Sequence, residues 1–154
     1  MSTTSTRNGA PPVNALHSAE AVVREFLDAL ARDDLDAALA LLDDDVAYTN
    51  VPFPTVHGRR TVDKLFRPMI GKAGFKVHFH AVAADGDVVL TERTDALIFG
   101  RVHWQFWVYG RFELRDGKIT VWRDSFDLVD INFGLLRGLV GAVIPGVARR
   151  WPTG

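Results

Sequence analysis

The chain has 154 residues, of which 47% are hydrophobic and 24% are charged, the size and balance of one soluble globular domain. It contains no cysteine, which excludes a disulfide scaffold, a cysteine nucleophile and a Cys-ligated metal or iron–sulfur centre. Its 18 basic and 19 acidic side chains give a formal net charge of −1, so the chain as a whole lacks the basic balance typical of nucleic-acid-binding proteins.

The beginning of the chain is small and polar. Residues 1–13 include two prolines and have no apolar core of the kind that a secretory signal needs, so we expect a flexible N-terminal lead-in and a cytoplasmic protein. Residues 14–154 show no repeat and no internal linker. They are predicted to form a single domain.

Three amphipathic helices are predicted in the first half of the chain. Their apolar residues recur at helical spacing in residues 19–30, 35–42 and 62–70. Ser18 can cap the first helix, and Asp33 or Asp34 can cap the second. Pro68 lies inside the third pattern and should kink or shorten that helix.

The pattern then changes to the alternation that is typical of strands. Strands are predicted at residues 46–51, 75–81, 88–98, 102–114 and 119–126, with Asp-Gly turns at 85–86 and 116–117. Helices followed by an antiparallel meander indicate an α+β fold. We expect a curved antiparallel sheet that forms a cone covered by the N-terminal helices, with a ligand pocket on its concave face.

The last part of the chain is apolar. Residues 131–147 are rich in glycine, but Arg137 and Pro145 interrupt them, and the run is shorter than a membrane span needs. The segment is expected to pack on the core or on a partner subunit as a helix or irregular chain, and the alternative is a membrane-surface anchor. Both faces of residues 102–109 carry large apolar groups, which favours a strand covered by the core on one side and by a second subunit on the other.

Polar side chains fall at strand positions where a core would be expected. Alternation puts Arg93 and Asp95 on one face of their strand, Asp124 on one face of another, and Tyr48 and Asn50 on one face of a third. If these are the concave faces, all five side chains share one apolar pocket. The alternative is that Arg93 and Asp95 form only an exposed ion pair, because alternation does not say which face is buried.

Two carboxylates and a guanidinium in an apolar pocket favour acid–base chemistry. Two carboxylates close together cannot both ionise easily, so the pKa of one rises, while an arginine between them keeps the other anionic. The pair then supplies one acid and one base near neutral pH. The Tyr48 hydroxyl and the Asn50 amide could hold a water molecule against the base, which suits addition of water to an electrophile whose leaving oxygen needs a proton.

The sequence resembles the limonene-1,2-epoxide hydrolase family, which belongs to the nuclear-transport-factor-2-like superfamily. The resemblance is carried by Tyr-Thr-Asn-Val-Pro-Phe-Pro at 48–54, Thr-Glu-Arg-Thr-Asp at 91–95 and Trp-Arg-Asp-Ser-Phe-Asp at 122–127. These motifs occur in the family's order, and the similarity covers roughly residues 18–130. The ordered set is far more specific than any of its parts.

The resemblance implies a role for each polar residue. Asp124 matches the general base that activates water, with Tyr48 and Asn50 holding that water. Asp95 matches the general acid that protonates the epoxide oxygen, and Arg93 matches the residue that bridges the two carboxylates. It also implies ring opening in one step without a covalent intermediate, a homodimer, and no cofactor or metal.

The substrate is expected to be a bulky apolar epoxide, because the predicted pocket wall is aliphatic and aromatic. The candidate wall residues are Val89, Leu97, Trp104, Phe106, Trp122 and Phe126. Nucleic acid and an integral membrane are not expected as partners.

Other interpretations remain open. His78 and His80 share a strand face and could begin a metal site, but they are more typical of surface or pocket-rim histidines because no third ligand is indicated. The cone could also serve a binding protein for apolar small molecules, or a ketosteroid-isomerase-like or polyketide-cyclase-like enzyme. A binding protein does not need the two carboxylates and the arginine, and an isomerase does not need a water holder.

Overall fold

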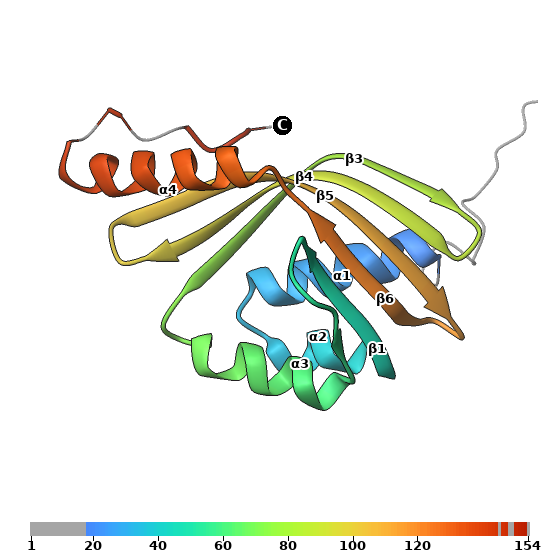
Figure 1. Cartoon of the computed structure of the whole chain (residues 1–154). Helices are drawn as coiled ribbons and strands as arrows, with labels where there is room; N and C mark the ends of the chain where they lie inside the picture. Colours follow the sequence, from blue (N-terminus) through green and yellow to red (C-terminus); the bar gives the residue numbers. More distant parts are fainter. Residues whose placement is uncertain (1–17, 145, 148–149, 154) are drawn as a thin grey trace, which may run out of the picture.

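The computed structural model describes residues 18–144, 146–147 and 150–153. The lead-in predicted for residues 1–13 therefore lies outside the described residues. Six strands form one sheet in the order β2-β1-β6-β5-β4-β3. Helices α1, α2 and α3 lie together on one side of this curved sheet, and α4 lies apart from them, beside β5 (Figure 1).

The helices begin and end near the positions that the sequence predicts. Helix α1 (Ala19–Ala31) is capped by the Ser18 hydroxyl, and α2 (Leu35–Ala40) is capped by Asp34. Helix α3 (Arg59–Phe66) stops two residues before Pro68, and a 3₁₀ turn (Arg67–Met69) follows it. The proline thus shortens the helix, because its ring cannot continue the hydrogen-bond pattern.

The predicted strands are confirmed, with one difference in how the sheet closes. The strands are β1 (Leu42–Val51), β2 (Val56–His57), β3 (Gly74–Asp85), β4 (Val88–Phe99), β5 (Val102–Arg115) and β6 (Lys118–Ser125). Strands β3 to β6 form the expected antiparallel meander, but β1 pairs with β6 in parallel. Strand β1 also begins four residues earlier than predicted, with an irregular register between Leu42 and Ala47.

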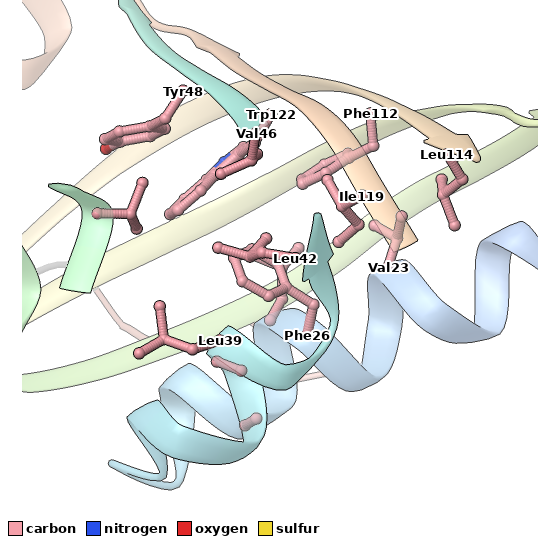
Figure 2. Close-up of a cluster of buried hydrophobic side chains, with 14 of the residues drawn as sticks. Val23, Phe26, Leu39, Leu42, Val46, Tyr48, Phe112, Leu114, Ile119 and Trp122 are labelled. Carbon is pink, nitrogen blue, oxygen red and sulfur yellow. The ribbon is translucent and has the colours of Figure 1, made fainter. Parts of the chain in front are cut away.

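The hydrophobic core lies between the N-terminal helices and one face of the sheet (Figure 2). Val23 and Phe26 of α1 contribute its helical side, and Phe112, Ile119 and Leu42 contribute the strand side. Each of these side chains is buried, with at most 1% of its surface exposed. The core fills the end of the fold where α1 lies over the sheet and leaves the other end free for a cavity.

The apolar C-terminal segment packs on its own chain, because helix α4 (Leu128–Val143) lies against the first half of β5. A helix of the same chain therefore covers part of the strand for which the sequence predicted a cover from a second subunit. Strand β6 pairs only with residues 109–115 of β5, which leaves the edge of residues 102–108 for the helix. Gly134 and Gly138 make the close approach possible: a Cβ atom on either would collide with the carbonyl oxygen of Gln105 or His103. Among the described residues, no helix is long and apolar enough to cross a membrane.

Candidate active site

A cavity of about 370 Å³ opens between the N-terminal helices and the sheet. Its volume lies within the range of small-molecule sites. Most of its wall is aliphatic or aromatic, and its polar groups are concentrated on three strands. Tyr48 and Asn50 come from β1, Arg93 and Asp95 from β4, and Asp124 from β6.

All five polar residues predicted from alternation line this cavity. Strand pairing explains why they meet, because Asn50 lies opposite Asp124 in the parallel β1–β6 pair. Arg93 contacts Asp95 on its own strand β4 and reaches Asp124 on β6 across the intervening strand β5. The exposed ion pair considered as the alternative is excluded, since Arg93 is fully buried and Asp95 is 5% exposed.

Arg93 bridges the two carboxylates. Its Nε donates to Asp95 at 2.9 Å and 3.1 Å, and its Nη2 lies 2.6 Å from Oδ2 of Asp124. Its third nitrogen, Nη1, donates to the Thr91 hydroxyl at 2.9 Å. Every nitrogen of the guanidinium is therefore engaged, which satisfies a buried cation and fixes both acids relative to each other.

Burial raises the pKa of two groups near Arg93, the Asp95 carboxyl and the Tyr48 phenol. It raises the pKa of Asp95 to about 7, with the Arg93 charge acting against this shift and the Asp124 charge adding to it. Burial and the Asp124 charge also raise the pKa of the Tyr48 phenol, so this hydroxyl keeps its proton. The site thus holds a carboxyl group that can carry a proton near neutral pH, beside a phenol that stays neutral.

The two oxygen atoms of the Asp124 carboxylate have different surroundings. Its Oδ2 accepts from Trp122 Nε1 at 2.8 Å and also contacts Arg93. Its Oδ1 is buried and has no hydrogen-bond partner within the part of the chain that the structure describes. A buried carboxylate oxygen without a partner is costly, and a bound water molecule that donates to it would satisfy it.

Tyr48 and Asn50 form a polar pair beside Asp124. The Asn50 side-chain amide donates to the Tyr48 hydroxyl oxygen at 2.5 Å. A tyrosine hydroxyl that accepts one bond can still donate one, and an asparagine amide also carries an acceptor oxygen. The pair therefore offers both kinds of hydrogen bond that a water molecule needs.

Five of the six predicted wall residues line the cavity: Leu97, Trp104, Phe106, Trp122 and Phe126. Val89 does not. It shares the strand face of Arg93, but it lies four residues back along β4, where α1 covers the sheet, and packs in the core with Val23 and Phe112. Alternation identifies the face correctly and cannot say where along the strand the core ends.

Sequence reasoning missed two residues that hold Arg93 in place. Thr91 accepts from its Nη1, and Gly110 lies opposite both Thr91 and Asp124 in the strand register. A Cβ atom on Gly110 would collide with Arg93 Nη1, and it would lie 2.5 Å from the Thr91 hydroxyl and 2.9 Å from Phe112. A lone glycine inside a long strand was the available signal, because it often marks a close approach.

Replacing Gly110 with Ala should therefore displace the guanidinium. We expect destabilisation of about 1–3 kcal/mol from overpacking and a roughly 100-fold loss of kcat/KM from misplaced acids, measured by thermal unfolding and steady-state kinetics. Gly74→Ala is the matched control on β3, because its Cβ would meet Ile98 Cβ at 3.3 Å and nothing in the site. A Gly110→Ala variant as active as the control would show that the position of Arg93 does not depend on the absence of a side chain at residue 110.

The histidine pair does not line the cavity. His80 is stacked on Trp107 with ring centroids 4.2 Å apart, and its Nε2 lies 2.8 Å from the Thr94 hydroxyl. His78 lies beside it, with the two imidazole centroids 4.9 Å apart. Within the described residues, no group of three or more His, Cys, Asp or Glu side chains is placed to hold a metal ion.

Comparison with known proteins gives consistent matches. Residues 17–137 match the family described as the limonene-1,2-epoxide hydrolase catalytic domain. Epoxide hydrolase EphG of Mycobacterium tuberculosis is 52% identical over 125 residues, which are 81% of this chain and 84% of that protein.

Solved structures agree with these sequence matches. A structure of an M. tuberculosis epoxide hydrolase of the limonene-1,2-epoxide hydrolase type superposes with a TM-score of 0.82 at 50% identity, covering 86% of this chain and 95% of that one. A putative polyketide cyclase from Xanthomonas campestris has a TM-score of 0.67 at 23% identity, covering 75% of this chain and 96% of that one, and shares the fold.

Proposed function

The chain belongs to the limonene-1,2-epoxide hydrolase family, and on that premise we propose that it adds water to an apolar epoxide to give a vicinal diol. The observation that carries the proposal is the buried bridge of Asp95, Arg93 and Asp124 at the polar end of an apolar cavity. Epoxide opening needs a base for the poor nucleophile water and an acid for the poor leaving alkoxide, and this bridge offers both.

In the proposed reaction, Tyr48, Asn50 and Asp124 hold a water molecule. Oδ1 of Asp124 takes a proton from the water as the water oxygen bonds to one ring carbon. The bond from that carbon to the epoxide oxygen breaks, and Asp95 gives its proton to the released oxygen. The site ends with its proton on Asp124 instead of Asp95, so its total charge is unchanged, and one proton transfer between the two acids restores it.

The proposed substrate is a bulky apolar epoxide. Support comes from the cavity, in which Trp104, Phe106 and Phe126 form an aromatic wall and Leu97 an aliphatic one. Such a wall favours a hydrocarbon body and leaves the epoxide oxygen as the group that can accept a hydrogen bond from Asp95. No metal, cofactor or ester intermediate takes part in the proposed step.

A panel of styrene-, terpene- and steroid-type epoxides in ¹⁸O-labelled water tests this proposal. Single-turnover reactions should place the label in the diol, and mass spectrometry should find none in the protein carboxylates. A label in Asp95 or Asp124 after one turnover would indicate an ester intermediate and contradict the one-step mechanism. Binding of the panel without any diol would favour the apolar binding protein instead.

We also expect a homodimer, as the family resemblance implies. Helix α4 exposes large apolar side chains, including Phe133 at 62%, Leu136 at 56% and Val143 at 79%. Several large exposed apolar side chains on one helix are typical of a contact with another molecule. The cytoplasmic location stays a prediction.

A further inference from the structure

We propose that Trp122 is a positioning residue that fixes the carboxylate of Asp124 through its indole N–H. This inference rests on the proposed function and assigns Trp122 a role beyond the cavity wall. The N–H donates to Oδ2 of Asp124 at 2.8 Å, on the same oxygen that contacts Arg93. The two donors together leave Oδ1 as the oxygen that receives the proton from water.

The indole ring is held so that its N–H has one direction. Its centroid lies 4.1 Å from that of Tyr48, 5.6 Å from that of Phe66, and 4.8 Å from that of Phe26, whose ring meets it edge-on. Trp122 is only 4% exposed, so the indole ring is almost completely removed from bulk water. A buried indole N–H needs an acceptor, and here the acceptor is the proposed base.

The chain geometry makes this contact local. Trp122 and Asp124 are two residues apart on β6 and therefore point to the same face of the sheet. Arg93 approaches the same Oδ2 from β4, two strands away, so the carboxylate is held by one local donor and one distant donor. Without the indole donor, the carboxylate can rotate about its Cβ–Cγ bond, and Oδ1 is no longer fixed toward the water.

A hydrogen bond donated to a carboxyl group changes its acidity according to which protonation state the bond favours. A donor to an ionised carboxylate stabilises the charged form, so removing it raises the pKa of that acid. The titratable groups that line the cavity with Asp124 are Tyr48 from β1, Arg93 and Asp95 from β4, and Asp33 from the turn after α1. The indole N–H donates to Asp124 and to none of these other groups.

Trp122→Phe tests the proposal because phenylalanine keeps an aromatic ring and removes the N–H. We expect kcat to fall roughly tenfold or more with little change in KM. The low-pH limb of the kcat/KM profile should move up by roughly one pH unit, while the high-pH limb stays in place.

Trp104→Phe is the matched control. Trp104 also lines the cavity, and its Nε1 donates to a neutral acceptor, the Ile131 carbonyl, at 2.8 Å. The same change of ring should therefore alter KM or stability without moving the low-pH limb. Equal limb shifts in both variants, or none in Trp122→Phe, would overturn the proposal. Wild-type protein without epoxide hydrolysis would instead contradict the proposed function.

A second measurement needs neither a folded Trp122→Phe variant nor a known substrate. In the wild-type protein, the indole N–H resonance of Trp122 should lie at the low-field position typical of a hydrogen bond to a carboxylate, and it should move upfield in Asp124→Asn. An indole resonance that is the same in the wild-type protein and in Asp124→Asn would overturn the inference even if Trp122→Phe were unfolded.

Discussion

Replacing Asp124 with Asn is expected to abolish nearly all diol formation while the protein keeps its fold. The amide cannot take a proton from water, and general-base assistance contributes roughly 10²- to 10⁴-fold. The change preserves the size of the side chain and one acceptor oxygen for Trp122 and Arg93, and it leaves the buried Arg93 paired with Asp95. Thermal unfolding should therefore stay close to that of the wild type, while kcat/KM falls by about three orders of magnitude.

Asp85→Asn provides the control for this experiment. It makes the same chemical change at an exposed position at the end of β3, outside the cavity. Its kcat/KM should equal that of the wild type. A folded Asp124→Asn variant with activity near this control would rule out Asp124 as the base.

Replacing Asp95 with Asn should be equally damaging for a different reason. Asparagine cannot supply the proton that the departing alkoxide needs, so we expect a loss of roughly 10²- to 10⁴-fold in kcat. The proposed mechanism needs Asp95 protonated in the wild-type enzyme, and burial raises the pKa of this acid to about 7. The kcat/KM of the wild-type enzyme should therefore fall about tenfold per pH unit above neutrality.

The residual activity of Asp95→Asn gives a second, sharper readout. It should lose the decline above neutral pH, because the group responsible for it is gone. Epoxides whose electron-withdrawing substituents stabilise the alkoxide should lose less activity than simple alkyl epoxides. A variant that kept the wild-type high-pH limb would show that the proton comes from another group.

The five polar site residues were accessible to sequence reasoning because strand alternation is a local property. Tyr48 and Asn50, or Arg93 and Asp95, share a face whatever the rest of the sheet does. That these faces meet in one cavity depends on the parallel pairing of β1 with β6. This contact joins segments more than 70 residues apart, as in the pair Asn50 and Asp124, and no local pattern reports it.

The residues that sequence reasoning missed have a common physical origin. Gly110 matters for the space it leaves to Arg93, and Thr91 matters for one acceptor atom that it turns toward the same guanidinium. Trp122 was predicted only as part of the wall, although its N–H contacts a carboxylate. Roles of this kind depend on side-chain directions and on distances of a few tenths of an ångström, which composition and periodicity do not carry.

The covering of β5 by α4 also bears on how the protein avoids aggregation through an unpaired strand edge. The first half of β5 runs past the end of its pairing with β6 and would otherwise offer unpaired backbone groups to a strand from another molecule. Gly134 and Gly138 let α4 pack directly on that stretch. Side chains at these two positions would push the helix away from the strand and uncover its edge. Attempts to engineer the apolar outer surface of α4 for solubility should therefore leave its glycine face untouched, since an uncovered β-edge invites fibrillar aggregation.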